Sequence, residues 1–317
     1  MLQSIQLMSF FLRTGYGDSD LHYGGNVDIP LQGGCQGNGA APALWIALSL
    51  CLVQHMQHHQ ESAIIITAIS LATIELAAVM YVDDSDLHKI GPHKATPAHE
   101  VHDAMQSQID TWRQGLHFTG GGLKDNKCYS YLQAYNWEGG QWQYAKISSL
   151  NLPPLTVQHD DNERYPIKLH DVDEATEYLG CMTRPDGDMK EQLDVIESKV
   201  KTWATNISAS ALDRSLVWTG LRGTIWKTIE YALPFAHFNK TQWTSLHKHL
   251  YRPVLPKAGA TRSFPLILRY APAAFYGLGL PDGEILQGTS KINFVLRNGA
   301  SGSLAHRGSP ALRHEAP

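Results

Sequence analysis

The sequence predicts an α+β fold, in which paired antiparallel strands with flanking helices are followed by a mainly helical region. Two stretches, residues 76–88 and 128–147, show short apolar or aromatic runs on either side of a turn, which favours strand pairs. From about residue 190 onward, apolar residues recur every three or four positions, which favours helices. The 317 residues, 43% of them hydrophobic, are enough for one large or two modest domains.

The first third of the chain is predicted to pass from loops into helices. Residues 1–39 are rich in glycine and are expected to form loops and short strands. A helix is predicted from Ala40 to the histidine-rich stretch at 55–60, because apolar side chains follow at helical spacing. A second helix is expected to begin after Thr96-Pro97 and to end near Leu116, since proline favours the first turn of a helix.

Two strand pairs are predicted in the same part of the chain. Residues 76–88 are expected to form two strands around a tight turn at Val82–Asp84. A longer strand over Cys128–Trp137, the turn Glu138-Gly139-Gly140 and a strand over Gln141–Ile147 are expected to form a second hairpin. These elements place residues 1–150 in one predicted domain.

Beyond residue 150 the pattern changes. Residues 151–175 are polar and contain proline, and are predicted to be a linker or an insertion. A short hairpin is expected over 176–187, with its turn at Pro185–Gly187. Helical stripes predict a helical region over 188–298, and the Gly/Ser/Pro-rich tail 299–317 is expected to be disordered. One stripe comprises Leu193, Ile196, Val200, Trp203 and Ile207, and the other Leu212, Leu216, Leu221, Ile225 and Ile229.

Charge is distributed unevenly along the chain. Residues 1–198 carry a net charge of −14, whereas residues 199–297 carry +9. A basic half beside an acidic half indicates a polyanionic partner held by the basic part, with metal ions at the acidic part as a further possibility. The competing interpretation is two solvated faces of opposite sign.

Other features limit the class of protein. The four cysteines form no C-x-x-C pair, which argues against a zinc site or a disulfide framework and predicts an intracellular, reducing location. Residues Ala63 to Met80 contain a single charged residue, Glu75, and are just long enough to span a membrane. Several hydroxyl side chains lower the hydrophobicity of this stretch, so we favour a buried segment and expect no membrane contact.

The sequence Tyr81-Val82-Asp83-Asp84 carries the strongest chemical signal. Two adjacent carboxylates at a hairpin tip repel each other unless a cation offsets their charge. Mg²⁺ prefers carboxylate oxygens and would relieve this repulsion. Taken by itself the pair is a weak signal, because consecutive aspartates are common in exposed turns.

Three further motifs lie in order around this one. A glycine-containing segment opens the first predicted helix, a lysine-containing segment follows the second, and a short hairpin sequence lies beyond residue 175. The motifs are Gln36-Gly37-Asn38-Gly39-Ala40-Ala41-Pro42-Ala43-Leu44-Trp45, Leu123-Lys124-Asp125-Asn126-Lys127-Cys128 and Tyr178-Leu179-Gly180-Cys181. This order of motifs resembles the reverse transcriptases, the RNA-directed DNA polymerases, and most of all those of retrotransposons. The resemblance covers about residues 30–190 by motif and extends to 188–298 by position only.

The resemblance implies a fold and a reaction. The first 150 residues would be part of a polymerase palm, 176–187 a primer-grip-like hairpin and 188–298 a thumb-like helical region. The implied activity is nucleotidyl transfer from deoxynucleotides to the primer of an RNA or DNA template-primer, by the product of a transposable element. Two Mg²⁺ ions would activate the primer hydroxyl and neutralise phosphate charge.

The resemblance also implies roles for residues near the carboxylates. Asp83 and Asp84 would be the metal-binding, catalytic carboxylates, with Asp83 the more essential of the two. Tyr81 would lie near the incoming nucleotide and the primer end. Lys127 would donate a proton to the departing pyrophosphate, and Lys124 is a weaker candidate for this role.

The remaining implied roles concern nucleic-acid binding. Gln36 and Gly37 would touch the nucleotide and the template, and Leu179 and Gly180 would touch the primer. The positive charge of the helical region would suit a primer–template duplex.

One departure from the family affects the expected activity. The family places a third metal-binding aspartate on a strand well upstream of the Q-G segment, and Gln36 has only 35 residues before it. Asp18, Asp20 and Asp28 are the acids in that stretch, and they lie in glycine-rich or turn-like surroundings. We therefore expect a fragment that lacks this strand and has no activity by itself.

Two alternative functions remain open at this point. The chain would otherwise be a non-catalytic, nucleic-acid-binding remnant of a retroelement that grips duplexes through residues 199–297. A less favoured alternative is a magnesium-dependent phosphodiesterase that uses Asp83 and Asp84 with other acids such as Asp86.

Two smaller groups of residues have both a structural and a functional interpretation. His55 and His59 lie one helical turn apart and would suit a metal pair, but a solvated helix end is favoured because no third ligand is apparent. Trp137, Trp142 and Tyr144 would stack nucleobases or, as is more common, pack against each other across the hairpin.

Overall fold

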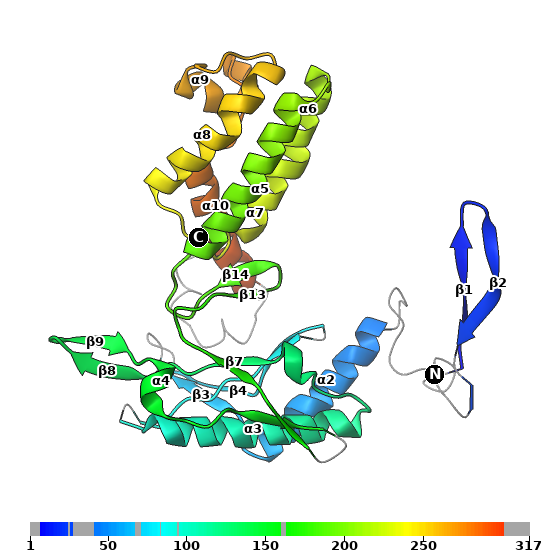
Figure 1. The fold of residues 1–317 in the computed structure, drawn as a ribbon, viewed down its shortest axis with the longest axis vertical. Helices are drawn as coiled ribbons and strands as arrows, with labels where there is room; N and C mark the ends of the chain where they lie inside the picture. Colours follow the sequence, from blue (N-terminus) through cyan, green and yellow to red (C-terminus); the bar gives the residue numbers. More distant parts are fainter. Residues whose placement is uncertain are drawn as a thin grey trace. The chain divides into compact units, whose positions relative to one another are not determined.

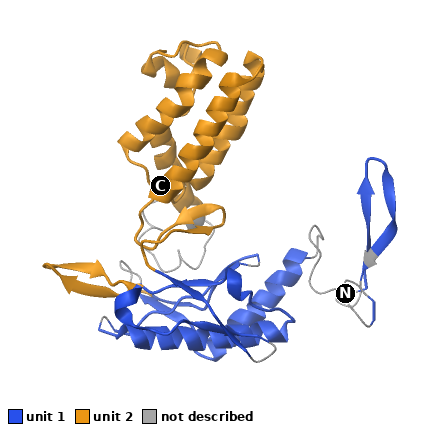
Figure 2. Cartoon of the chain, viewed as in Figure 1, with its two compact units in different colours: residues 1–66, 73–132, 147–170 blue, residues 67–72, 133–146, 171–317 orange. Residues whose placement is uncertain are grey.

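The computed structural model describes residues 7–24, 26–27, 41–66, 71–82, 84–93, 95–159 and 163–300. Helices and short, two-stranded sheets are mixed in these residues, so the expected α+β composition is confirmed (Figure 1). The chain divides into two compact units (Figure 2). Unit 1 comprises residues 1–66, 73–132 and 147–170, and unit 2 comprises residues 67–72, 133–146 and 171–317.

Two helices form the centre of unit 1. Helix α2 covers Ala41–His58 and helix α3 covers Ala98–Phe118, close to the predicted bounds. The helices meet at Gly115, where an added Cβ would lie 3.1 Å from the side chains of both Leu52 and His55. Glycine at this position therefore lets the two helix backbones approach closely.

Unit 1 also contains several short strand pairs, each of only two strands. The antiparallel pairs are β1 (Ser9–Thr14) with β2 (Gly17–Gly24), β3 (Ala63–Ile66) with β4 (Thr73–Leu76), β5 (Val79–Tyr81) with β6 (Asp84–Asp86), and β10 (Thr156–Gln158) with β11 (Arg164–Pro166). The parallel pair is β7 (Tyr129–Tyr131) with β12 (Lys168–His170). The apolar stretch 63–80 thus begins as a strand pair, and no helix in the described part of the chain is long and apolar enough to cross a membrane.

Part of the predicted linker belongs to the core of unit 1. Leu155, Val157 and Ile167 are buried and pack with Ile109 of α3. The Gln106 side chain donates a hydrogen bond to the Thr156 carbonyl (2.9 Å) and accepts one from the Thr156 amide (2.8 Å), so it satisfies the edge of β10 as a neighbouring strand would. Residues 155–159 and 163–170 are therefore packed structure rather than a linker, and the last change from unit 1 to unit 2 along the chain falls after residue 170.

The strand predicted over Cys128–Trp137 is in fact two strands. Strand β7 pairs with β12, whereas β8 (Tyr135–Glu138) pairs with β9 (Gln141–Tyr144). The chain changes partner between them, so one continuous strand is excluded. The turn at Gly139-Gly140 is confirmed, and both glycines have positive φ (59° and 83°).

Unit 2 is built mainly from helices that follow a short hairpin. The hairpin consists of β13 (Thr176–Tyr178) and β14 (Cys181–Thr183). The helices are α5 (Lys190–Ala209), α6 (Arg214–Gly220), the π-helical turn η2 (Leu221–Ile225), α7 (Trp226–Ala232), α8 (Lys240–Lys257), α9 (Leu266–Tyr270) and α10 (Gly283–Ala300). Shorter helical segments are α4 (Ile147–Leu150) and η1 (Asp125–Lys127) in unit 1 and η3 (Ala273–Phe275) in unit 2.

One apolar cluster joins the helices of unit 2. Trp226, Trp243 and Tyr251 are among its largest members, and each is almost fully buried. Gly283, the first residue of α10, lies so close to Trp243 that an added Cβ would overlap the indole ring. The start of α10 is therefore fixed against α8.

A buried histidine lies within the same cluster. The His247 Nδ1 atom is 2.9 Å from the Tyr270 hydroxyl, and its Nε2 atom accepts a hydrogen bond from the Gly283 amide (3.3 Å). Nε2 must be unprotonated to accept this bond, so the imidazole is neutral with its proton on Nδ1. The pKa of His247 is lowered to about 4, mainly by burial; the nearby Asp282 charge opposes the shift and the Arg269 charge adds to it.

Two sequence predictions for unit 2 need correction. The turn of the short hairpin is at Leu179–Gly180 and not at Pro185–Gly187, because Tyr178 pairs directly with Cys181. The second helical stripe is wrong only at its start: Leu216 is 51% exposed and Val217 is fully buried, whereas Leu221, Ile225 and Ile229 are buried as predicted. Asp213 accepts hydrogen bonds from the amides of residues 215 and 216, so α6 begins there and Leu212 precedes it. The predicted tail lies outside the described residues from 301 onward.

Candidate nucleic-acid interface

The Y-V-D-D sequence forms the tip of the β5–β6 hairpin. Tyr81 pairs with Asp84 across a two-residue loop, and Val82 has a positive φ of 56°. A branched residue rarely adopts this conformation, so the loop is a tight turn held by its strands. Asp83 lies outside the described residues. The positions of Tyr81, Val82 and Asp84 confirm the turn that the sequence predicts here.

Apolar residues fix this hairpin to the helices of unit 1. Met80 packs against the cluster formed by Leu52, Met56 and Trp112, while Tyr81 on the neighbouring face is 59% exposed. Alternation along a strand sends successive side chains to opposite faces. One face of β5 is therefore buried on the helices and the other leaves the Tyr81 ring open to solvent.

Polar contacts hold the chain after β6. The Glu61 carboxylate receives hydrogen bonds from Lys89 (2.5 Å) and from the Ser107 hydroxyl (2.5 Å). The buried Gln108 amide donates to the carbonyls of Glu61 (2.6 Å) and His88 (3.1 Å). The ends of α2 and β6 are thus tied to the middle of α3, which limits movement of the Y-V-D-D hairpin.

The lysine motif forms a single 3₁₀ turn in the same unit. Lys124 and Lys127 are exposed at its two ends, and the Asp125 carboxylate lies 3.4 Å from the His159 ring. Burial raises the pKa of the Cys128 thiol, and the Asp125 charge raises it further. Leu123 packs against both apolar clusters of unit 1, as Leu87 after β6 does. The segments that carry Lys127 and the Y-V-D-D hairpin therefore contribute leucines to the same apolar clusters of unit 1.

The described carboxylates do not by themselves make a metal site. Asp84 and Asp86 lie two residues apart on β6 and so project from the same face of the strand. Their oxygens are the type of donor that Mg²⁺ prefers. No group of three or more His, Cys, Asp or Glu side chains suited to a metal ion occurs among the described residues, a set that omits Asp83. We therefore derive no catalytic step through a metal ion.

The Leu179–Gly180 pair has the same local construction as the Y-V-D-D tip. It is a two-residue loop between paired strands, and both residues have positive φ (48° and 78°). These values are those of a type I′ turn, which suits glycine well and leucine poorly. The Tyr231 hydroxyl donates a hydrogen bond to the Leu179 carbonyl (2.7 Å), which holds the strained residue in place.

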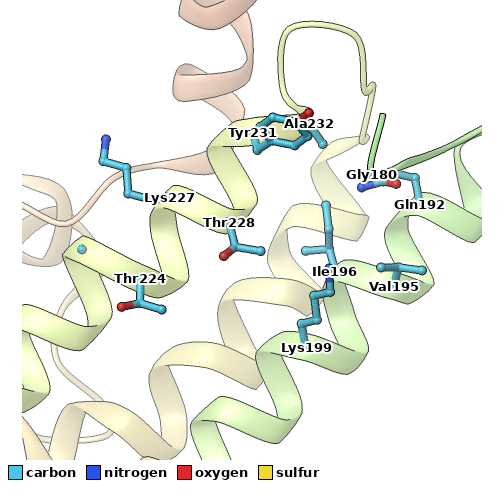
Figure 3. A pocket seen from close by; sticks show the side chains of 11 residues that line it. Gly180, Gln192, Val195, Ile196, Lys199, Thr224, Lys227, Thr228, Tyr231 and Ala232 are labelled. Atoms are coloured by element: carbon cyan, nitrogen blue, oxygen red, sulfur yellow. The ribbon is translucent and has the colours of Figure 1, made fainter. Parts of the chain in front are cut away.

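Gly180 lines a cavity of about 400 Å³ in unit 2 (Figure 3). Lys199 and other residues of α5 form one wall, and the π-helical turn and α7 form the other, with Lys227 upon it. The complete lining is Gly180, Gln192, Val195, Ile196, Lys199, Gly223, Thr224, Lys227, Thr228, Tyr231 and Ala232. No carboxylate lines this cavity, so its rim offers ammonium groups, hydroxyls and amides.

The two lysines differ in their surroundings. Lys227 is paired with Glu230 at 2.5 Å, whereas no ion pair to Lys199 occurs in the part of the chain that the structure describes. Burial raises the pKa of the neighbouring Cys181 thiol, and the Lys199 charge opposes that shift. Lys199 is thus the cation most available to an anionic ligand, since no carboxylate must first be displaced.

Several cavity residues were not predicted from the sequence. Lys199, Lys227 and Tyr231 each lie on a helix that the periodicity predicted, but a single lysine on an exposed face carries no local signal. The net positive charge of residues 199–297 was the one available indication. Gln36 and Gly37, predicted to contact nucleotide and template, lie outside the described residues.

Comparison with known proteins adds no assignment. No protein-family model matches the chain, and no curated protein matches it.

Proposed function

We propose that this chain is the palm and thumb part of a retrotransposon-type reverse transcriptase, and that unit 2 holds the backbone of a template-primer duplex. The cavity at the Leu179–Gly180 turn carries this proposal. It joins the hairpin motif that resembles a primer grip to two lysines and two threonine hydroxyls from neighbouring helices. Phosphate oxygens accept hydrogen bonds from these groups, and backbone contacts of this kind are independent of base sequence.

Geometry supports a backbone ligand in preference to a small apolar one. A glycine at the tip of the hairpin and another on the π-helical turn present no side chain, so an extended ligand would approach the backbone closely at both points. The Tyr231 hydroxyl is already engaged with Leu179, so its role is to position the hairpin. Lys199 and Lys227 would supply the charge.

Duplex binding is the first test of the proposal. A fluorescently labelled RNA–DNA duplex is titrated with the full chain at several salt concentrations, and binding is followed by anisotropy. Lys199→Gln is expected to weaken binding severalfold and to reduce the slope of log affinity against log salt by about 1, the value for one lost phosphate contact.

Lys248→Gln is the matched control, because Lys248 is also an exposed lysine in the middle of a long helix of unit 2 and lies outside the cavity lining. Equal weakening by Lys248→Gln and Lys199→Gln would mean that binding is diffuse and that the cavity is not the site.

Primer extension tests the polymerase part of the proposal separately. The chain is supplied with an RNA template, a DNA primer, deoxynucleotides and Mg²⁺, and Asp83→Asn and Asp84→Asn variants are compared with it. Extension that both substitutions abolish would support an active polymerase. Duplex binding without extension is the result expected both of a fragment that lacks the third metal-binding aspartate and of a non-catalytic nucleic-acid-binding remnant.

A further inference from the structure

The β8–β9 hairpin sorts its side chains onto two chemically different faces. Tyr135 pairs with Tyr144 and Trp137 with Trp142, so all four aromatic residues lie on one face. The intervening pairs are Asn136 with Gln143 and Glu138 with Gln141, which makes the other face polar.

The aromatic face is open to solvent along its whole length. Every residue of both strands is exposed, and the four rings are between 37% and 66% exposed. Trp226 and Trp243 of the helical core are at most 2% exposed by comparison. A core role is therefore excluded for the hairpin aromatics, and an exposed apolar patch bordered by polar groups is typical of an interaction site.

Contacts between the rings account for only part of their surfaces. The two tryptophan rings meet edge to face, with centroids 5.2 Å apart, and the two tyrosine rings are tilted by 33° with centroids 4.8 Å apart. The neighbouring Tyr144 side chain raises the pKa of Tyr135. Cross-strand packing thus orients the rings and leaves faces of them free.

Spacing along the hairpin suits flat ligands. Successive residues on one face of a strand are about 6.7 Å apart, roughly twice the thickness of an aromatic ring. A planar base would therefore fit between the tyrosine pair and the tryptophan pair. The turn at Gly139-Gly140 has open space where a Cβ would point, so nothing in the described residues obstructs the end of the hairpin.

Charge and composition favour nucleobases over other occupants. The hairpin's one carboxylate, Glu138, lies on the polar face, so phosphates near the aromatic face meet no acidic group of the hairpin. Neither strand contains an aliphatic side chain. Insertion into a bilayer normally draws on aliphatic residues as well, whereas stacking of bases needs only flat rings.

We propose that the β8–β9 hairpin binds unpaired nucleobases of a single-stranded nucleic acid by stacking them on Tyr135, Trp137, Trp142 and Tyr144. The inference rests on the proposed function in that the ligand is a nucleic acid, but the hairpin shares no residue with the cavity at Gly180. A single strand next to a duplex held by unit 2 would be one source of such bases.

The experiment compares two ligands with the same number of phosphates. A labelled oligothymidylate of about 15 nucleotides and an abasic strand of equal length are each titrated with the full chain. Trp137→Ala/Trp142→Ala is expected to weaken oligothymidylate binding about tenfold or more and to leave the abasic strand unaffected. Trp137→Leu/Trp142→Leu, which keeps an apolar cross-strand pair, is expected to give the same loss and so excludes unfolding of the hairpin as the cause.

Gln141→Ala/Gln143→Ala on the polar face is the matched control and is expected to bind both strands as the unaltered chain does. Unchanged oligothymidylate binding by the tryptophan variants would overturn the inference. The inference would also be overturned if the tryptophan variants lost self-association or vesicle binding but kept oligothymidylate binding. That result would identify a second copy of the chain or a bilayer as the occupant. The duplex titration separates the two proposals, because Lys199→Gln alters duplex binding while the tryptophan variants leave it unchanged.

Discussion

Units 1 and 2 bury their apolar side chains in different ways. Among the described residues, unit 2 gathers 21 buried residues into one apolar cluster, whereas two apolar clusters of four buried residues each hold the helices and ribbons of unit 1 together. A helix satisfies its own backbone hydrogen bonds, so helices in unit 2 can pack along their whole length. A two-stranded ribbon leaves both outer edges unpaired and gains little stability by itself.

The difference in packing between the two units bears on how firmly each candidate site is held. The candidate catalytic hairpin is in the weakly packed unit and relies on specific contacts such as Glu61 with Lys89 and Ser107. The cavity with Lys199 and Lys227 is built on helices whose inner faces are fully buried, so those lysines are carried on a rigid support.

Removal of one large buried side chain from each unit is expected to give the largest difference. Trp226→Ala should lower the free energy of unfolding of unit 2 by about 3–5 kcal/mol and leave it folded, because many buried neighbours remain. Trp112→Ala removes the largest member of a four-residue cluster, so the cooperative unfolding of unit 1 should be lost. Hydrogen exchange of peptides from α3 and α7 reports each unit separately, and equal loss of protection in both would contradict the comparison.

Acidification is expected to weaken unit 2 selectively. The pKa of His247 is about 4 in the folded chain and near 6.5 when unfolded, so the unfolded state binds more protons between these values. The free energy of unfolding of unit 2 should therefore fall as the pH drops from about 6.5 to 4, by roughly 3 kcal/mol in total. Urea unfolding at a series of pH values measures this.

Two histidine variants make the acid test specific. His247→Gln should flatten the pH dependence over this range even if it lowers stability, whereas His237→Gln, at an exposed position, should leave the dependence intact. A pH dependence that survives in His247→Gln would assign the effect to another group.

Loss of a helix cap is expected to have the smallest effect. The Asn239 side-chain oxygen accepts a hydrogen bond from the Gln242 backbone amide, and the Gln242 side-chain oxygen accepts one from the Asn239 backbone amide, which makes a capping box at the start of α8. Asn239→Ala should lower the stability of unit 2 by about 1 kcal/mol, measured by thermal or urea unfolding. Asn239→Asp keeps an accepting oxygen and should be close to neutral; a matching loss in both variants would exclude the cap as the cause.

Much of the local structure could be predicted from residues close together in the chain. Helices α2, α3 and α5 follow from apolar spacing, and the turn at Gly139-Gly140 follows from residues that suit tight turns. The mixed α+β composition follows from these elements. The assignment to a polymerase palm stays a prediction, carried by the order of the motifs.

The incorrect local predictions have a common cause. The strand over Cys128–Trp137 looked continuous because both of its halves have strand-forming residues, but each half pairs with a different strand. Proline, aspartate and glycine at 185–187 resembled the turn of the second hairpin more than Leu179-Gly180 did. Composition ranks candidate turns, whereas pairing across the turn selects one of them.

The sequence by itself determined the long helices, the turn at Gly139-Gly140 and the charge asymmetry, because each depends on neighbouring residues or on composition. Tertiary structure alone decided that β7 pairs with β12, that Gln106 satisfies the edge of β10, and that Lys199 and Lys227 line one cavity with Gly180. These contacts join residues tens of positions apart. Their formation depends on the packing of whole helices and strands, which no local pattern specifies.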